Sequence, residues 1–399
     1  MKKVSVVILL IYFAPIRLWA QFVNSGQQLT ISDKGLVYID DSYLHNSGSV
    51  TNNGSMVVKG NWTNNDHSSF VFNNVSKGAV FLNGGLQQID GTDKTVFPSL
   101  DLSGYYFKKL LTDADVNGNL SLNDVEFKLE DRILTVLNNR PSAVSRTKGF
   151  ISTDKGGMLN RSLTNTGQYL YPFGSSLHSG IYRPLEMILK NASGSNEGVV
   201  SATFYYDDPS NLGYSRNSKS EELRNMNIYD KYFYVLKQKS GYPLVNVRFY
   251  QGIEENLFPR LAKTPKGGLW SLATSDPHVL QNSAAEPFAK YLEYESLQPL
   301  DEAFTFTEAG SLIFYNAFSP DGDGKNDTWL IKNIDSYPDN EITIFNRWGN
   351  EIYKTKGYSS AKPWDGGAMM SGTYFYVLNV TMNGERRTFK GFITMIKKD

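Results

Sequence analysis

Asparagine and glycine recur at short intervals through residues 21–140, and this punctuation limits what the segment can fold into. Gly48, Gly54 and Gly60 are spaced six apart, and Gly78 and Gly84 repeat the interval, with Asn46, Asn52, Asn53 and Asn61 beside them. Brief apolar clusters such as 56–58 and 80–82 lie between. Asn and Gly accept the left-handed conformations of tight turns, and the clusters supply inward side chains. The pattern favours a solenoid-like stack of short strands, with an irregular antiparallel sheet as the alternative.

Longer strands with alternating character follow in residues 141–310. Segments 201–206, 232–236, 245–250 and 303–307 alternate apolar and polar residues or are rich in aromatic and β-branched ones. Clusters of Gly, Pro, Asn and Ser separate them. Period-two patterning of this kind predicts a β-sandwich. The segment 220–225 is the one candidate for a short helix, and we interpret it as a loop. The whole chain is therefore predicted to be all-β.

Four short, turn-rich sequence motifs, which we call words, follow one another within residues 311–399, at 316–329, 345–350, 364–366 and 372–376. Strand-like segments 341–345 and 351–354 flank the second word, which predicts a β-hairpin with a five-residue connection. Asn383-Gly384 is a strong hairpin turn signal between segments 374–380 and 389–396. Six or seven strands in about 85 residues predict a small immunoglobulin-like sandwich.

These words resemble those of the gliding-motility-associated C-terminal domain, the type B sorting domain of the type IX secretion system of Bacteroidetes. The resemblance covers Asn316 to Lys397. It implies export through the inner membrane by a signal peptide and recognition of the folded domain by the outer-membrane type IX machinery. Release to, or display on, the cell surface would follow, with the preceding residues as cargo. The residues that carry the resemblance are Phe318, Pro320, Gly322, Asp323, Gly324, Asn326, Asp327, Phe345, Asn346, Arg347, Trp348, Gly349, Asn350, Trp364, Asp365, Gly366, Gly372, Thr373, Tyr374 and Tyr376. The segment 21–310 is only loosely similar to other surface cargo of that phylum.

Two acidic segments are candidates for calcium. Asp321, Asp323 and Asp327 stand close together in a Gly-rich turn, and hard carboxylate oxygens suit calcium. The alternative is that Asp and Gly simply build a sharp turn after Pro320. Residues 113–119 imitate the start of a calcium loop, with Asp124 at its twelfth position, but their flanks are strand-like. We interpret that segment as a turn between solenoid strands.

The N-terminus has the pattern of a secretory signal peptide over residues 1–20. Two lysines precede an apolar run of about ten residues, too short to span a membrane as a helix, which takes ~20. Cleavage is expected between Ala20 and Gln21, and no transmembrane span is expected in the mature chain. The chain has no cysteine, which excludes disulfides and thiolate chemistry. Its 40 basic and 40 acidic residues cancel, so charge gives no reason to expect nucleic acid as a partner.

No catalytic constellation is visible in the sequence. The four histidines, His45, His67, His178 and His278, are far apart. Adjacent acidic pairs, Asp207-Asp208 and Glu254-Glu255, would point to opposite faces of a strand rather than towards one bond. We therefore predict an exported, structural or adhesive surface protein, with surface glycans or proteins as further partners. The alternative is a secreted carbohydrate-active or other hydrolytic protein that uses the same sorting domain.

Overall fold

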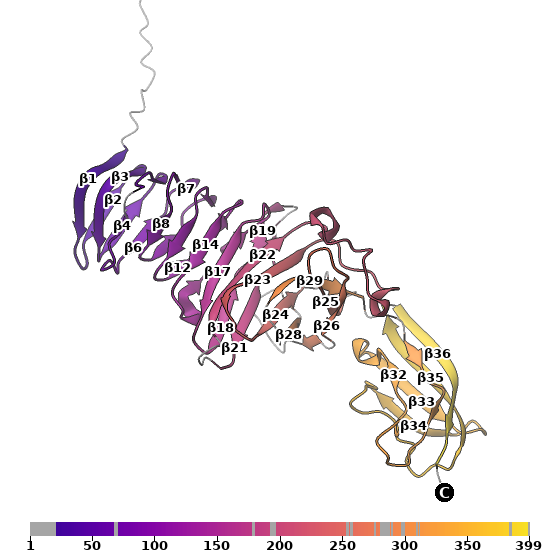
Figure 1. Ribbon diagram of the computed structural model, residues 1–399. Coiled ribbons are helices and arrows are strands. Elements are labelled where there is room, and N and C mark those ends of the chain that lie inside the picture. Colours follow the sequence, from indigo (N-terminus) through magenta and orange to yellow (C-terminus); the bar gives the residue numbers. More distant parts are fainter. Residues whose placement is uncertain are drawn as a thin grey trace, which may run out of the picture.

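The computed structural model describes residues 21–67, 71–177, 180–191, 197–252, 255, 258–274, 277–279, 288, 290–296, 300–308, 310, 312–382 and 385–397 (Figure 1). These residues form strands, turns and four short 3-10 helices: η1 (Pro141–Ala143), η3 (Pro209–Leu212), η4 (Glu221–Leu223) and η6 (Ile334–Ser336). No α-helix occurs among them, so the predicted all-β class is confirmed. The sequence signal at 220–225 corresponds to the single turn of η4.

The N-terminal region is a parallel β-solenoid of about seven turns. Sheet A contains β1 (Phe22–Ile31), β3 (Tyr43–Asn52), β5 (Trp62–Asn64), β7 (Gln87–Gly91), β10 (Phe107–Leu110), β13 (Glu126–Lys128) and β16 (Phe150–Ser152). Sheet B contains β2 (Leu36–Ile39), β4 (Ser55–Val58), β6 (Ala79–Leu82), β9 (Leu100–Leu102), β12 (Leu120–Ser121) and β15 (Val144–Ser145). Neighbouring strands are parallel throughout both sheets. The pairing confirms the solenoid and rules out the antiparallel alternative.

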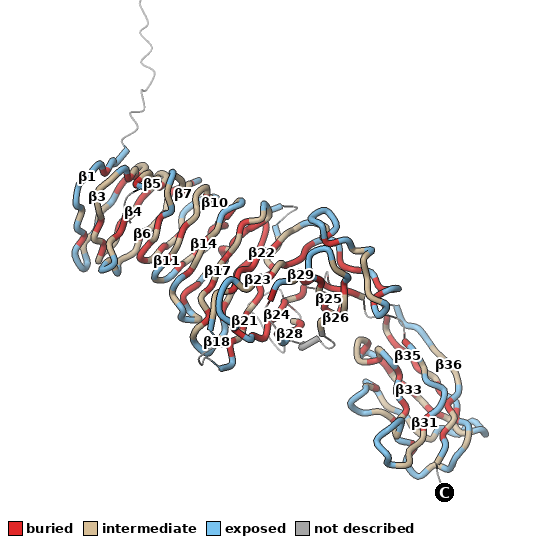
Figure 2. The backbone as a smooth tube through the Cα atoms, in the orientation of Figure 1, coloured by how far each residue is buried: buried red, intermediate tan, exposed pale blue. Residues whose placement is uncertain are grey.

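Inward side chains form ladders along the solenoid, and each turn contributes one side chain to each ladder. In sheet B the register aligns Val80 with Leu100, Leu100 with Leu120, and Leu120 with Val144. All four are buried, and Figure 2 shows the buried positions continuing along the interior from turn to turn. The alternating pattern therefore buries one side of each strand against the opposite sheets, which stabilises the stack through apolar area removed from water.

The regularly spaced glycines are required mainly because the turns approach one another closely. A Cβ on Gly54 would lie 2.2 Å from the carbonyl oxygen of Gly35, and one on Gly78 would lie 2.2 Å from that of Gly54. Of the five glycines spaced at six in the sequence, only Gly48 has a positive φ. Buried Asn52 supports the same corner, because its side chain accepts from Gly54 N–H and donates to the carbonyl oxygen of Ala79. Close stacking, more than left-handed backbone, explains the punctuation.

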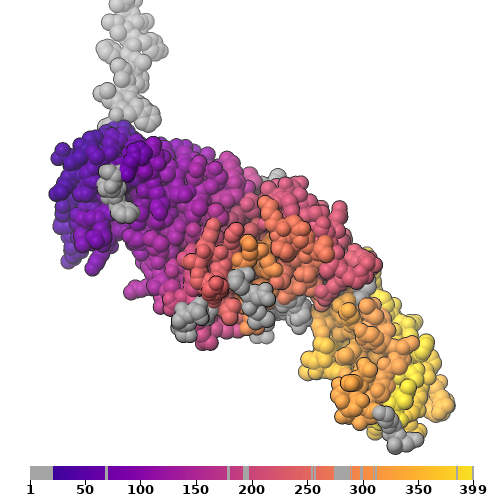
Figure 3. All heavy atoms as spheres, viewed as in Figure 1, coloured from indigo at the N-terminus to yellow at the C-terminus, as the bar shows by residue number. Residues whose placement is uncertain are grey.

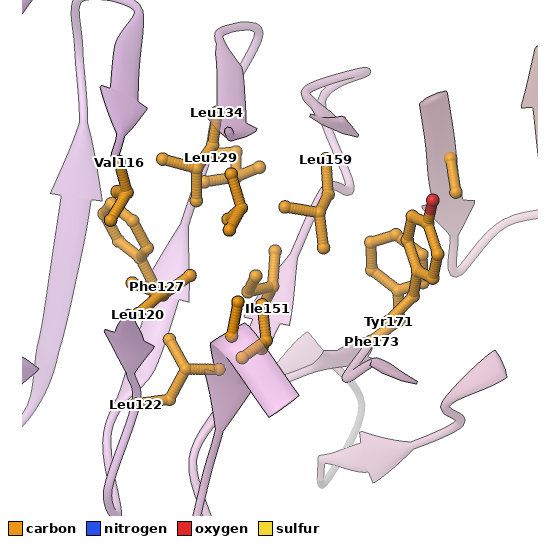
Figure 4. Close-up of a cluster of buried hydrophobic side chains, with 14 of the residues drawn as sticks. Val116, Leu120, Leu122, Phe127, Leu129, Leu134, Ile151, Leu159, Tyr171 and Phe173 are labelled. Atoms are coloured by element: carbon orange, nitrogen blue, oxygen red, sulfur yellow. The ribbon is translucent and has the colours of Figure 1, made fainter. Parts of the chain in front are cut away.

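The third side of the solenoid continues into an antiparallel sheet. In the order in which hydrogen bonds join them, the strands of sheet C are β8 (Thr95–Phe97), β11 (Ala114–Val116), β14 (Ile133–Val136), β17 (Met158–Leu163), β22 (Gly198–Tyr205), β23 (Phe233–Gly241), β29 (Asp301–Thr307), β25 (Arg260–Thr264) and β26 (Ser271–Thr274). Pairing is parallel up to β17 and antiparallel from β22 onward. The solenoid and the middle region therefore share one sheet and one core, whose buried side chains Figure 4 shows from Val116 to Phe173.

A second antiparallel sheet covers the middle part of sheet C. Sheet D contains β18 (Gly167–Tyr171), β21 (Leu185–Leu189), β24 (Val245–Gln251), β28 (Lys290–Glu295) and β27 (Pro277–Val279), and β19 (Gly174–Ser175) pairs with β20 (Ile181–Tyr182) beside it. Phe249 of sheet D meets Tyr234 and Phe304 of sheet C with ring centroids 5.2 Å apart in both pairs. The two sheets pack face to face, as sandwich patterning predicts.

The C-terminal domain is a separate lobe with its own core (Figure 3). Its five-stranded C-terminal sheet has the order β31 (Ala317–Phe318), β36 (Glu385–Met395), β35 (Gly372–Met382), β33 (Asn340–Phe345) and β34 (Glu351–Lys356). The pair β30 (Ile313–Phe314) and β32 (Ile331–Lys332) covers one face, with the Phe314 ring stacked 5.1 Å from that of Tyr376. Seven described strands agree with the predicted six or seven, and the hairpin β33–β34 lies where it was predicted; Asn383-Gly384 falls outside the described residues.

Candidate functional site

The Asp-rich loop of the first word is organised by its own carboxylates. Gly322 and Gly324 donate their N–H groups to the two oxygens of Asp327 at 2.6 and 2.8 Å. Lys325 N–H donates to Asp323 at 2.8 Å. Positive φ angles of 79° at Gly322 and 82° at Gly324 allow this tight path. Turn-building, the simpler interpretation of the sequence, is therefore one function of these side chains.

The same loop gathers three carboxylates. Asp321, Asp323 and Asp327 each bring one oxygen to within 4.8 Å of the others. Oxygens that share a calcium ion, each about 2.3–2.6 Å from it, lie within this separation of one another. Both oxygens of Asp327 also accept backbone N–H groups, which holds that carboxylate in a fixed orientation. The donor set fits calcium in chemistry and spacing.

The second word forms the connection between β33 and β34. The side-chain oxygen of Asn346 accepts N–H groups from Trp348 and Asn350, both at 3.0 Å. Gly349 has a φ of 83°, and its N–H donates to the carbonyl oxygen of Asn346. The guanidinium of Arg347 lies 4.6 Å from the centre of the exposed Trp348 ring. Asn346 and Gly349 therefore shape the loop, whereas Arg347 and Trp348 are left at the surface.

The third and fourth words supply the core of this lobe. Trp364 is buried between Phe318, at a centroid distance of 5.4 Å, and Tyr374, at 5.5 Å. A Cβ on Gly366 would lie 2.2 Å from the sulfur of Met395, so this glycine allows close packing. Asp365 accepts Gly367 N–H at 2.9 Å. Gly372 and Thr373 begin β35, from which Tyr374 and Tyr376 point into the core.

The words meet at one end of the C-terminal sheet. Register places Gly372 opposite Met395, Phe318 beside Met395 and Phe345 opposite Phe375, so the loops after Phe318 and Phe345 and the approach to Gly372 lie at the same end. We call this the distal end. It lies farthest from the solenoid in Figure 1. The opposite end contains Tyr337, whose hydroxyl donates to the carbonyl oxygen of Gly310 in the connection to the middle region.

Exposed apolar side chains at the distal end that were not in the predicted set include Met370, Phe375, Phe392 and Ile396. Strand alternation could have indicated Phe375, because Tyr374 and Tyr376 on either side belong to the inward face. A hollow of about 450 Å³ lies between the second word and residues 368–374, with Trp348 and Met370 in its lining.

The other predicted segments have structural partners. Asp113 accepts Ile133 N–H at 2.9 Å, and Asp115 on β11 pairs with Lys94 at 2.6 Å. The segment 113–119, which resembles the start of a calcium loop, is therefore part of the solenoid wall. Asp208 pairs with Arg216 at 2.6 Å. Glu255 is buried against Arg183 at 2.9 Å, and its neighbour Glu254 lies outside the described residues.

The histidines are dispersed. His45 is buried, with the Tyr43 hydroxyl 2.9 Å from one ring nitrogen and Asp66 3.5 Å from the other. Burial lowers the pKa of His45, and the charge of Asp66 opposes this shift. His67 is exposed beside Asp93. His178 and the side chain of His278 fall outside the described residues.

Comparison with protein families identifies the C-terminal domain. Residues 312–395 match the family model described as the CHU_C type IX secretion signal domain. This match confirms the predicted sorting domain and supports export of the chain as type IX cargo to the cell surface or the medium. No curated protein and no solved structure matches the chain. Within the described part of the chain, no helix has the length and apolarity to span a bilayer.

Proposed function

We propose that this chain is a type IX cargo whose solenoid and sandwich serve as a structural or adhesive module outside the cell. The observation that carries the proposal is the match of residues 312–395 to a type IX secretion signal domain. The separate core of that domain supports it, because a sorting label recognised in its folded state needs its own stability. The domain would be recognised by the outer-membrane type IX machinery.

Truncation tests this sorting role. A chain ending before residue 312 should remain in the periplasm, whereas the full chain reaches the surface or the medium. Both are measured by fractionation and immunoblotting. A fluorescent protein fused to residues 312–399 provides the converse test, and we expect this fusion to be exported. Unchanged export of the truncated chain would refute the sorting role.

The adhesive role is supported by the shape and surface of the solenoid. Parallel stacking gives a continuous wall, from whose turns Tyr105 and Tyr106 project into solvent. Tyr106 has a φ of 58°, a strained value for a bulky residue. Exposed aromatic rings suit recognition of surface glycans or proteins. Replacing both with serine should lower adhesion of displaying cells severalfold at unchanged surface level, measured by cell binding to glycan-coated surfaces; equal adhesion would remove these side chains from the role.

The Asp-rich loop is proposed as a calcium site. Asp321, Asp323 and Asp327 supply the oxygens, and bound calcium would neutralise their mutual repulsion. Calcium should raise the midpoint of the thermal transition of the C-terminal domain relative to chelator. Asp323→Asn should reduce the shift, because it removes one ligand charge from the most exposed of the three while keeping an oxygen that can accept Lys325 N–H. Equal midpoints with calcium and chelator would show that the loop is a turn only.

A hydrolytic role is the second candidate, and one hollow favours it. Asp154 and Glu130 line a hollow of about 310 Å³ on sheet A. Burial raises the pKa of Asp154, which suits a proton donor. However, Glu130 pairs with Lys155 and Asp154 accepts from Ser175, so both are engaged. Turnover of a polysaccharide by the exported chain, abolished by Asp154→Asn, would support hydrolysis; its absence across a polysaccharide panel would leave the non-enzymatic role.

We also propose that residues 1–20 are removed during export. These residues lie outside the described part of the chain. The proposal is supported by the position of β1, which begins at Phe22, so cleavage between Ala20 and Gln21 would leave the first strand intact. Mass spectrometry of the exported protein should find Gln21 at its N-terminus.

A further inference from the structure

Most side chains of the sorting words are already used to build the domain. Phe318, Trp364 and Tyr374 are buried together in its core. Asp327 and Asn346 accept the backbone N–H groups of their own loops. A partner that recognises the folded domain must therefore contact side chains that the words leave exposed, on the outer face of the sheet or on the loops.

The outer face of the C-terminal sheet carries three aligned phenylalanines near the distal end. Register places Phe345 directly opposite Phe375, and Phe375 directly opposite Phe392. Directly opposed residues have Cβ atoms about 4.5–5.5 Å apart, so the three form one aromatic row across β33, β35 and β36. Phe375 is 48% exposed and Phe392 52% exposed. Ile396, also exposed, continues the same face beyond β36.

The aromatic row is bordered by exposed charge and by two apolar loop tips. The adjacent row runs Lys354, Thr343, Val377, Lys390, with a lysine at each end. Lys354 also pairs with Glu341 of the same sheet at 3.4 Å. Glu351 stands opposite Phe345 at the sheet edge. At the distal end, Trp348 is 71% and Met370 81% exposed. Farther from the distal end the same face turns polar, with Asn379 opposite Thr388.

The location separates this surface from the rest of the chain. The distal end points away from the solenoid and the middle region in Figure 1. Apolar side chains that remain in water on a folded domain contribute no burial energy, and concentrated patches of this kind mark interaction sites. The patch therefore lies where a partner can reach it while the cargo remains folded behind it.

We propose that the aromatic row, Phe345, Phe375 and Phe392, is the surface through which the sorting domain is recognised. Its partner would be a protein face with an apolar centre and acidic side chains opposite Lys354 and Lys390. The inference rests on the proposed sorting function and deepens it by assigning the contact to the outer sheet face. Phenylalanines give the apolar anchor of such an interface, and the lysine row sets its orientation.

The test compares two pairs on the same two strands and the same face. The full chain carrying Phe375→Ser and Phe392→Ser should lose about tenfold in exported fraction, as expected when anchors of an interface are removed. The matched control, Asn379→Ala with Thr388→Ala, should be exported normally. Thermal melts of both purified variants should match the wild type, which shows that the loss is not a folding defect. Phe375→Leu with Phe392→Leu preserves the apolar character and should restore export.

Charge reversal and lipid binding distinguish the kind of partner. Lys390→Glu should lower export, because acidic side chains on the partner would then be repelled. Sedimentation of the full chain with anionic phospholipid vesicles should show no dependence on the phenylalanines. A phenylalanine-dependent association with vesicles would replace the protein partner with a membrane surface.

The failures of the two proposals are separable. Normal export of the serine variant, while the chain truncated before residue 312 stays in the periplasm, would refute the aromatic row and leave the sorting function intact. Normal export of the truncated chain would refute the sorting function itself.

Discussion

The ammonium group of Lys108 lies in the interior of the solenoid, where a lysine is rarely found. It donates to the carbonyl oxygens of Gly84 and Gly85 at 3.0 and 2.8 Å and to the side-chain oxygen of Gln87 at 2.7 Å. Gln87 in turn donates to the carbonyl oxygen of Val58 one turn earlier. One charged side chain thus donates to three acceptors at this buried corner.

Replacing this lysine should destabilise the solenoid. Lys108→Met keeps the apolar stem but removes three hydrogen bonds. Gly84 O and Gln87 Oε1 retain the N–H groups of Tyr105 and Gly84, whereas Gly85 O loses its donor, so the free energy of unfolding should fall by about 1–3 kcal/mol. Lys109→Met is the control on the outward side of the same strand, where a half-exposed ion pair to Glu130 contributes under about 1 kcal/mol. Chemical denaturation measures both, and equal stability of the two variants would contradict the role of Lys108.

The buried histidine of the second turn predicts acid sensitivity. Burial lowers the pKa of His45 below its ordinary value of 6.5, so the folded chain takes up this proton less readily than the unfolded chain. Its contribution to stability is present above pH 6.5 and is lost as the pH falls below that value. Thermal midpoints at about pH 7.5 and about pH 5 should differ less in His45→Gln than in the wild type. His67→Gln controls for loss of a histidine; identical acid sensitivity in all three chains would contradict the prediction.

At the scale of elements, two adjacent glycines show whether glycine is required for close stacking of turns or only for backbone flexibility. A Cβ on Gly84 would lie 1.9 Å from the carbonyl oxygen of Lys59, whereas the nearest atom to one on Gly85 is 3.9 Å away. Gly84→Ala should therefore lower stability by about 1–3 kcal/mol through overpacking between turns, and Gly85→Ala should change it little. Equilibrium unfolding of the two variants compares them directly, and equal losses would show that stacking distance does not decide the effect.

Local sequence patterns predicted strands and turns better than they predicted which strands pair with one another. Gly48, Gly54 and Gly60 indicated the solenoid although all three lie in one of its turns, in β3 and on either side of β4, because their spacing of six reflects its short strands and corners. The switch of sheet C from parallel at β17 to antiparallel at β22 could not be predicted, since a period-two strand looks the same whichever way its neighbour runs. For the same reason the alternation at Tyr374 and Tyr376 could have indicated an outward Phe375 but not its alignment with Phe345 and Phe392.

At the scale of the whole molecule, the distribution of buried side chains divides the chain into two units. One apolar core runs from Ile31 in the solenoid to Phe306 in the sandwich, a smaller cluster that includes Phe233 and Trp270 lies in the middle region, and another core lies within the C-terminal domain. Two hydrogen bonds link described residues of the units: Arg260 donates to Asn333 at 3.3 Å, and Tyr337 donates to the carbonyl oxygen of Gly310 at 2.9 Å. A continuous core favours cooperative unfolding, whereas thin polar contacts transmit little stability.

The chain should therefore unfold in two transitions that respond to different substitutions. Leu134→Ala removes a buried side chain from the first core and Ile344→Ala one from the core of the C-terminal domain, each at a cost of about 2–5 kcal/mol to its own unit. Calorimetry of the full chain should show that each variant shifts one transition and leaves the other in place. Truncation before residue 312 should remove the transition that Ile344→Ala shifts. A single transition moved by both substitutions would mean that the sorting domain and its cargo are stabilised together, and recognition of an independently folded domain would then lose its physical basis.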